Sequence, residues 1–82
     1  MVTLRLFAHL REIAGTGRVD VEASGVGAVL DEACRRFGPR FADGLPSASI
    51  WLNGEPFDGS PDDPLPDGAE VAVVPPVSGG AG

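Results

Sequence analysis

The residues with the clearest chemical potential lie at the C-terminus, which reads Pro75-Pro76-Val77-Ser78-Gly79-Gly80-Ala81-Gly82. A glycine carboxylate is the least hindered acyl group that a polypeptide can present, and neighbouring glycines let a chain enter a narrow site. The two prolines lack backbone N–H donors and stiffen the start of the segment. From Pro75 to Gly80 an extended chain reaches up to about 20 Å. The pattern favours a carboxylate offered to another protein's active site, and an ordinary disordered end is the alternative.

Candidates for chemistry elsewhere in the chain are sparse. His9 is the only histidine and Cys34 the only cysteine, so neither has the partners of a usual zinc site. Cys34 lies near the expected C-terminal end of a helix, which disfavours a thiolate. Four aspartates share one loop without the spacing of an EF-hand: Asp58, Asp62, Asp63 and Asp67. We therefore expect no metal site, no permanently bound cofactor and no catalytic residues, and we do not expect an enzyme.

Charge and composition narrow the choice of partners. The net charge of −6 over 82 residues disfavours nucleic acid and anionic membranes and favours a protein partner with a basic surface. All six basic residues are arginine, so the chain has no lysine for its own terminus to acylate. No apolar run approaches the roughly 20 residues needed to cross a membrane, and the N-terminus lacks the pattern of a secretory signal. With a single cysteine, the chain is expected to be cytoplasmic.

Hydrophobic periodicity predicts one domain over residues 1–74, followed by a flexible tail over residues 75–82. Strands are expected over residues 2–7, 18–22, 49–53 and 70–74, with a short strand after Asn53-Gly54, a strong hairpin signal. In the first strand, alternation puts Phe7 on the polar face. A short helix is expected over residues 8–14, closed by Gly15.

The main helix is expected over residues 26–37, where apolar side chains recur at helical spacing. Ser24 or Gly25 can cap its start, and Gly38 can end it in left-handed geometry before Pro39. Residues 39–49 are expected to form a loop that can hold one helical turn. This order of elements favours an α+β fold with the long helix across a mixed sheet of about five strands. A β-grasp (ubiquitin-like) arrangement satisfies it, with the first and last strands parallel at the centre.

Three stretches of the chain form a pattern that is typical of a known family. They are Leu6-Phe7-Ala8 with Leu10-Arg11-Glu12-Ile13-Ala14-Gly15, then Pro64-Leu65 with Asp67-Gly68-Ala69-Glu70-Val71-Ala72, and finally Pro75-Pro76-Val77-Ser78-Gly79-Gly80. In these stretches the chain resembles the MoaD/ThiS family of ubiquitin-like sulfur carrier proteins, most closely the small subunit of molybdopterin synthase. The resemblance extends from Met1 to Gly80. Thiamine-synthesis relatives are usually shorter and lack the double proline.

The resemblance implies a mechanism and two partners. An E1-like activating enzyme uses ATP to adenylate the terminal glycine carboxylate, and persulfide sulfur then replaces AMP to give a thiocarboxylate. The tail, from Pro75 to Gly79, inserts into a sulfur-accepting synthase that resembles the molybdopterin synthase large subunit. The chain is then a carrier or synthase subunit without its own catalytic residues. The family also implies docking through the exposed sheet face, here at Phe7 and Val74, with Phe57 as a weaker candidate.

The chain departs from the family at its end, because typical members stop at the diglycine and this one continues with Ala81-Gly82. A protease that removes these two residues would expose Gly80, which is the interpretation that we favour. Alternatively, Gly82 itself is activated. The chain could also serve another pathway, such as cysteine, thiamine or specialised-metabolite synthesis. An interaction module or ubiquitin-like protein modifier is the alternative of another class.

Overall fold

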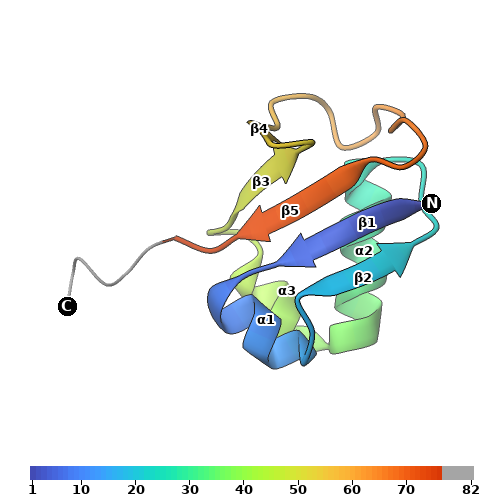
Figure 1. Cartoon of the computed structure of the whole chain (residues 1–82). Helices are drawn as coiled ribbons and strands as arrows, with labels where there is room; N and C mark the ends of the chain where they lie inside the picture. The colour runs from blue at the N-terminus through green and yellow to red at the C-terminus, as the bar shows by residue number, and fades with distance from the viewer. Residues whose placement is uncertain (77–82) are drawn as a thin grey trace.

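The computed structural model describes residues 1–76; the expectations for residues 77–82 lie outside this part. Along the chain the elements are β1 (Val2–Leu6), α1 (Ala8–Ala14), β2 (Arg18–Val21), α2 (Val26–Phe37), α3 (Pro39–Gly44), β3 (Ser49–Leu52), β4 (Glu55–Pro56) and β5 (Glu70–Val74). The strands form one mixed sheet in the order β2-β1-β5-β3-β4 (Figure 1). This arrangement confirms the predicted α+β class and its β-grasp strand order.

The two central strands, β1 and β5, are parallel, as predicted. Leu4 lies opposite Val71 and Leu6 opposite Val73. The outer neighbours, β2 beside β1 and β3 beside β5, pair in antiparallel fashion. Because β5 has a strand on each side, the chain leaves the sheet from its middle, through the buried Pro75.

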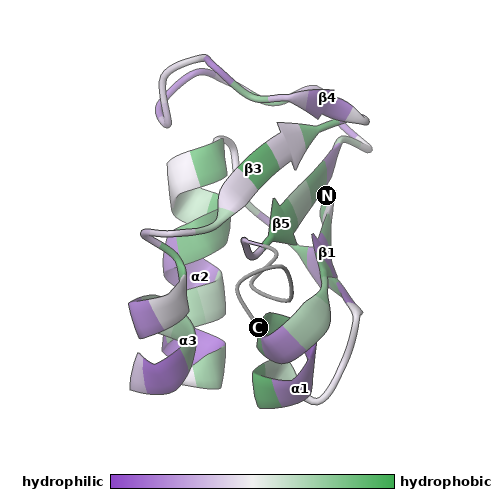
Figure 2. Cartoon of the chain, turned by 90° about the vertical axis from the view of Figure 1, so that its left-hand side faces the viewer, coloured by the Kyte–Doolittle hydropathy of each residue, from purple (hydrophilic) through white to green (hydrophobic). Residues whose placement is uncertain are grey.

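Helices cover only one face of the sheet, which we call the inner face (Figure 2). Alternate residues of the strands point to it, and the apolar stripe of α2 packs over them. Phe41 of α3 is fully buried, and its ring lies 5.3 Å from that of Phe37. The buried core consists of Val2, Leu4, Leu6, Leu10, Val21, Val26, Val29, Ala33, Phe41, Ala69, Val71 and Val73.

Helix α2 has the predicted bounds, but no side chain caps its start. Gly25 is the N-cap residue, and a Cβ there would lie 2.7 Å from the carbonyl oxygen of Pro61. The amide of Gly27 donates a hydrogen bond of 3.0 Å to that same oxygen. The absence of side chains at these glycines therefore lets the loop before β5 pack directly against the beginning of α2.

Several local expectations were wrong in detail. The first strand ends at Leu6, because Phe7 becomes the N-cap of α1. Gly38 has a positive φ of 89° but a ψ of −173°, so it is not in left-handed helical geometry and instead leads directly into α3. That helix begins at Pro39, two residues before the helical turn expected around residues 41–45 of this loop, because Pro suits the first helical turn and Phe41 anchors it in the core.

The predicted hairpin turn is confirmed, with Asn53 at φ 50° and Gly54 at φ 84°. This pair of positive φ angles matches the turn geometry that links antiparallel strands with two residues.

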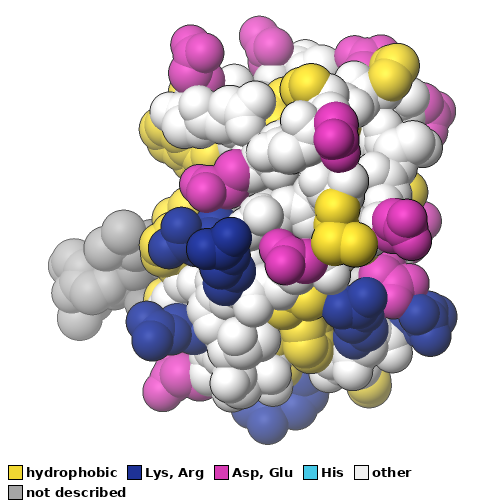
Figure 3. Space-filling model, turned by 45° about the vertical axis from the view of Figure 1, so that its right-hand side comes forward, with side chains coloured by type: hydrophobic (Ala, Val, Ile, Leu, Met, Phe, Trp, Pro, Cys, Tyr) yellow, Lys and Arg dark blue, Asp and Glu magenta, His cyan; other side chains and the backbone are white. Residues whose placement is uncertain are grey.

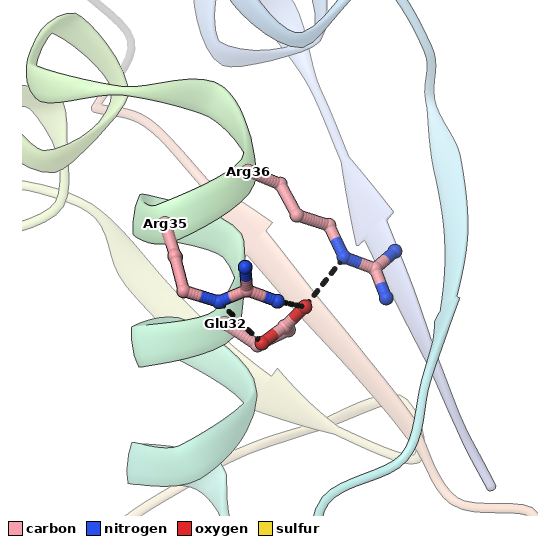
Figure 4. A network of polar contacts seen from close by, with 3 residues as sticks. All are labelled: Glu32, Arg35 and Arg36. Atoms are coloured by element: carbon pink, nitrogen blue, oxygen red, sulfur yellow. Dashed lines mark hydrogen bonds and ion pairs between the residues drawn. The ribbon is translucent and has the colours of Figure 1, made fainter.

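Three charged residues of α2, Glu32, Arg35 and Arg36, are paired within the helix (Figure 4). Glu32 accepts hydrogen bonds from Arg35 Nε at 3.1 Å and from Arg36 Nε at 2.7 Å. These contacts lower the pKa of the Glu32 carboxyl. The spacing of three and four residues brings such side chains together on a helix surface. Within the described residues, none of the helices has the length and apolar character needed to span a membrane.

Candidate functional site

The candidate site is the face of the sheet opposite the helices, which we call the open face; it is turned toward the viewer in Figure 1. Because side chains alternate along a strand, the residues between the core positions point to this side. The open face is defined here by Arg5 at the end of β1, Phe7 just beyond it, Arg18 of β2, Trp51 of β3, and Ala72 and Val74 of β5. Thr3, Asp20 and Glu70 lie on the same side of the sheet, toward the other end of β1.

Phe7 is 39% exposed at the end of the open face nearest the C-terminal segment. Its extended backbone, with φ of −135°, directs the chain from β1 into α1. The next residue, Ala8, has a φ of 53°, an uncommon value for a residue other than glycine. Because Leu6 lies opposite Val73, Phe7 and Val74 follow at the same end of the two central strands. The structure therefore brings together two of the three predicted interface residues.

Phe57, the third predicted interface residue, is placed differently. It follows the edge strand β4, is half-buried, and packs against the hydrophobic core. Its amide donates a 2.9 Å hydrogen bond to the carbonyl oxygen of Ile50. The structure thus separates Phe57 from Phe7 and Val74 by at least the width of β3.

Trp51 is an open-face residue that the sequence analysis did not include in the interface. It is 36% exposed and lies opposite Ala72 of β5. The alternation that points the half-buried Ile50 and Leu52 inward also points Trp51 away from the core, so periodicity predicts its exposure but not its neighbours.

Arg5 lies between these aromatic residues. Its guanidinium carbon sits 5.9 Å from the centre of the Phe7 ring, a distance at which a cation and an aromatic face attract. Its Nη1 atom is 3.7 Å from a carboxylate oxygen of Glu70, which makes a loose ion pair. The open face therefore combines exposed aromatic side chains with a positive charge, as protein-binding surfaces often do.

The other candidates for chemistry remain apart from this face. His9 is exposed on α1. Cys34 is half-buried on α2, and burial raises the pKa of its thiol. Among residues 1–76, no three His, Cys, Asp or Glu side chains gather closely enough to hold a metal ion. Pro75 and Pro76 continue from β5, while the other predicted tail residues lie outside the described part: Val77, Ser78, Gly79, Gly80 and Gly82.

Comparison with known proteins shows where this architecture recurs. Residues 4–80 match the model of the ThiS family. Small archaeal modifier protein 1 of Haloferax volcanii is 30% identical, with a TM-score of 0.75 over 94% of this chain and 96% of its own. The corresponding protein of Methanosarcina acetivorans is 28% identical, with a TM-score of 0.82 over 94% of this chain and 93% of its own.

A third similar structure is a putative molybdopterin converting factor, subunit 1, of Pyrococcus furiosus. It is 29% identical, with a TM-score of 0.77 over 93% of this chain and 97% of its own. A search of curated protein sequences found no match. Because the family model spans nearly all of the chain, and the fold of the chain is similar to those of these structures, this chain belongs to the ThiS family of ubiquitin-like sulfur carriers.

Proposed function

We propose that this chain carries sulfur as a thiocarboxylate on a C-terminal glycine and delivers it to a synthase. The observation that carries the proposal is the family match, which ends at residue 80, the second glycine of the Gly79-Gly80 pair. The domain supports it by directing β5 out through the middle of the sheet beside the exposed Phe7. A docked partner would thereby meet both the open face and the segment that follows it.

The chemistry requires activation because a carboxylate is a poor electrophile. An oxygen of the glycine carboxylate attacks the α-phosphorus of ATP on an E1-like enzyme, and pyrophosphate leaves. A persulfide sulfur then attacks the acyl carbon, so that a C–S bond forms and AMP departs. A thiol cleaves the resulting S–S bond and releases the thiocarboxylate together with a disulfide. The carrier contributes an accessible acyl group, and its partners contribute the catalysts.

Within this proposal, the chain itself is not a catalyst. Cys34, the only thiol, is half-buried, and its pKa is raised, which makes it a poor nucleophile. The activating enzyme and the synthase use the same terminal glycine in turn. Since neither enzyme needs to disturb the core, one open face serves both docking events.

Gly80 is the glycine that we assign as the sulfur carrier, with Gly82 as the alternative. Assignment to Gly80 requires a protease to remove Ala81-Gly82. A methyl group at Ala81 would also add bulk to a segment that must enter a narrow active site, and two further residues would lengthen its reach by about 7 Å. These considerations favour cleavage before activation.

The proposed acceptor is a precursor of molybdopterin, delivered to a synthase partner that resembles the large subunit of molybdopterin synthase. The similarity to a putative molybdopterin converting factor subunit of Pyrococcus furiosus supports this choice. Carriers for cysteine, thiamine or specialised-metabolite synthesis use the same chemistry and differ only in the acceptor.

A ubiquitin-like protein modifier is the second candidate function. The 30% identity to small archaeal modifier protein 1 of Haloferax volcanii favours it. A modifier would be found with its terminal glycine in an amide bond to a lysine of another protein. The chain has no lysine, so such a modifier could not form lysine-linked chains with itself.

The test is intact-mass spectrometry after incubation with the activating enzyme from the same organism, MgATP and a persulfide donor. Three proteins are compared: the full chain, a chain ending at Gly80, and a chain ending at Gly79 as the control. We expect only the chain ending at Gly80 to gain the mass difference between sulfur and oxygen. A gain on the full chain alone would assign the role to Gly82, and no gain on any chain would contradict the proposed function.

A further inference from the structure

The charges of this acidic protein are unevenly distributed. In the upper third of Figure 3 the charged side chains in view are all acidic, while arginines begin near the middle. The loop before β5 contributes four aspartates to the acidic end: Asp58, Asp62, Asp63 and Asp67. The net charge of −6 therefore does not describe the surface beside the open face.

A surface hollow at the edge of the open face is lined by three of the six arginines. Arg5, Arg11 and Arg18 line it together with Phe7, and none of its lining residues is acidic. Gly17 also lines it, and a Cβ at this glycine would lie 3.2 Å from Arg11 Nε. The glycine thus leaves room for the Arg11 side chain beside the other two arginines.

The arginines on the sheet face one another across β1 and β2. Arg5 lies directly opposite Arg18, and like charges at opposed positions of an antiparallel pair destabilise a sheet. Arg5 Nε is shielded from solvent and has no hydrogen-bond partner among the described residues. A shielded donor without a partner also costs stability. Arg5 has a loose ion pair with Glu70, at 3.7 Å, and an anion between Arg5 and Arg18 would relieve the remaining repulsion between the two guanidinium groups.

We propose that the open face docks on a protein partner that places a carboxylate side chain between Arg5 and Arg18, beside an apolar pocket for Phe7. This inference rests on the proposed function, because the partner meant is the enzyme that activates the C-terminal glycine. Charge complementarity selects that occupant, since three arginines in a hollow without acidic residues attract a carboxylate. The net charge of the whole chain predicts a partner with a basic surface, but the arginines of this hollow favour a partner with an acidic side chain.

Trp51 lies on the other side of Arg5 from the hollow and extends the open face toward β3. It lies opposite Ala72, which in turn lies beside Arg5. A partner that covers Phe7 and Trp51 therefore also covers the guanidinium of Arg5 and excludes water from it. Exclusion of water strengthens a charge pair, so we expect Arg5 to contribute more to binding than an arginine at the rim of the interface.

The test measures how well the cognate activating enzyme uses the carrier in ATP–pyrophosphate exchange. The double variant Arg5→Gln with Arg18→Gln is compared with Arg35→Gln plus Arg40→Gln, which has the same net charge but changes only the helical layer. We expect the first variant to raise KM by about tenfold at low salt and the control by less than about twofold. Added salt should weaken binding of the original chain and of the control, and should have little effect on the first variant.

The melting temperature provides a readout that is independent of any partner. Arg18→Gln removes the repulsion with Arg5, so the melting temperature should stay constant or rise while KM increases. Equal KM values for the two double variants would overturn the acidic-partner proposal and leave sulfur transfer intact. A fall in melting temperature for Arg18→Gln would show that Arg18 serves the fold. If exchange is absent for every chain, including the one ending at Gly80, both the proposed function and this inference fail.

Discussion

The two faces of the sheet are made from adjacent residues of the same strands, yet they differ in almost every physical property. On the inner face, Leu4, Leu6, Val71 and Val73 are at most 2% exposed. On the open face, the residues between them leave an arginine, an alanine and a valine partly accessible. Because side chains alternate along each strand, neighbouring residues serve different roles: one packs in the core, and the next is available for binding a partner.

The contrast extends to charge. On the helical layer behind the inner face, Glu32 binds both Arg35 and Arg36. On the open face, Arg5 has only a loose contact with Glu70 and lies opposite another arginine. The comparison teaches that the Glu32 cluster on α2 pairs its charges within one helix, whereas on the open face the charge of Arg5 is paired only loosely.

The largest expected effect is on the inner face, with Leu6→Ala. Leu6 is 2% exposed and belongs to the core, and removal of a buried leucine costs about 2–5 kcal/mol through lost burial and the cavity left behind. Chemical denaturation should therefore show a much lower unfolding free energy. A change smaller than about 1 kcal/mol would mean that the inner face is less tightly packed than its burial indicates.

For Phe7, the residue after Leu6, we expect a small effect on stability and a large effect on binding. Phe7→Ala should lower the unfolding free energy by only about 1 kcal/mol, because Phe7 is already partly exposed. It should weaken docking to the activating enzyme by at least about tenfold, since aromatic anchors dominate many interfaces. Both quantities are measured on the same preparation, by denaturation and by the KM of pyrophosphate exchange.

Phe57→Ala is the matched control for that experiment, because it removes the same side chain from a position that packs against the core. We expect it to reduce stability more than Phe7→Ala does and to leave KM nearly unchanged. An increase in KM equal to that of Phe7→Ala would show that the docking surface extends to the edge strand. It would contradict the assignment of stability and binding to separate faces.

The smallest effect concerns the paired charges of the helical layer. Hydrogen bonds from Arg35 and Arg36 lower the pKa of Glu32 below its usual value of 4.5. A carboxyl group with a lowered pKa contributes stability above its unfolded pKa and loses that contribution as pH falls through its folded pKa. Glu32→Gln should therefore reduce the melting temperature at pH near 7 and have little effect at pH near 3.

The exposed Glu12 of α1 offers the control, because no ion pair is found for it among residues 1–76. Glu12→Gln should leave the melting temperature nearly constant at both pH values. A pH-independent loss for Glu32→Gln would show that shape rather than charge explains its contribution to α2.

Much of the fold followed from local pattern. The bounds of α2 and β5 agree with the predicted ones because a strong apolar stripe and a run of β-prone residues leave few alternatives. The end of β1, the backbone of Gly38 and the start of α3 were predicted less well. Each depends on how Phe7, Pro39 and Phe41 meet distant parts of the chain, and local periodicity does not contain that information.

The candidate site was also predicted from the sequence only in part. Alternation alone identified Phe7 as an apolar residue on a polar face, and family resemblance added Val74. Resemblance also added Phe57, which the structure places at an edge and partly in the core. The role of Trp51 required knowledge of the sheet order, because only pairing with β5 brings it onto the surface that also bears Arg5.

The sequence by itself determined the family, the order of elements and the presence of an unhindered diglycine segment, because these depend on residue type and spacing along the chain. Only the tertiary structure decided that the hollow beside Phe7 is lined by three arginines and no acidic residue within an acidic protein. Net charge sums residues wherever they lie, whereas a partner responds to the charges within about 10 Å of its own surface. The pairing of β1 with β2 and the turn into α1 bring Arg5, Arg11 and Arg18 together around one hollow.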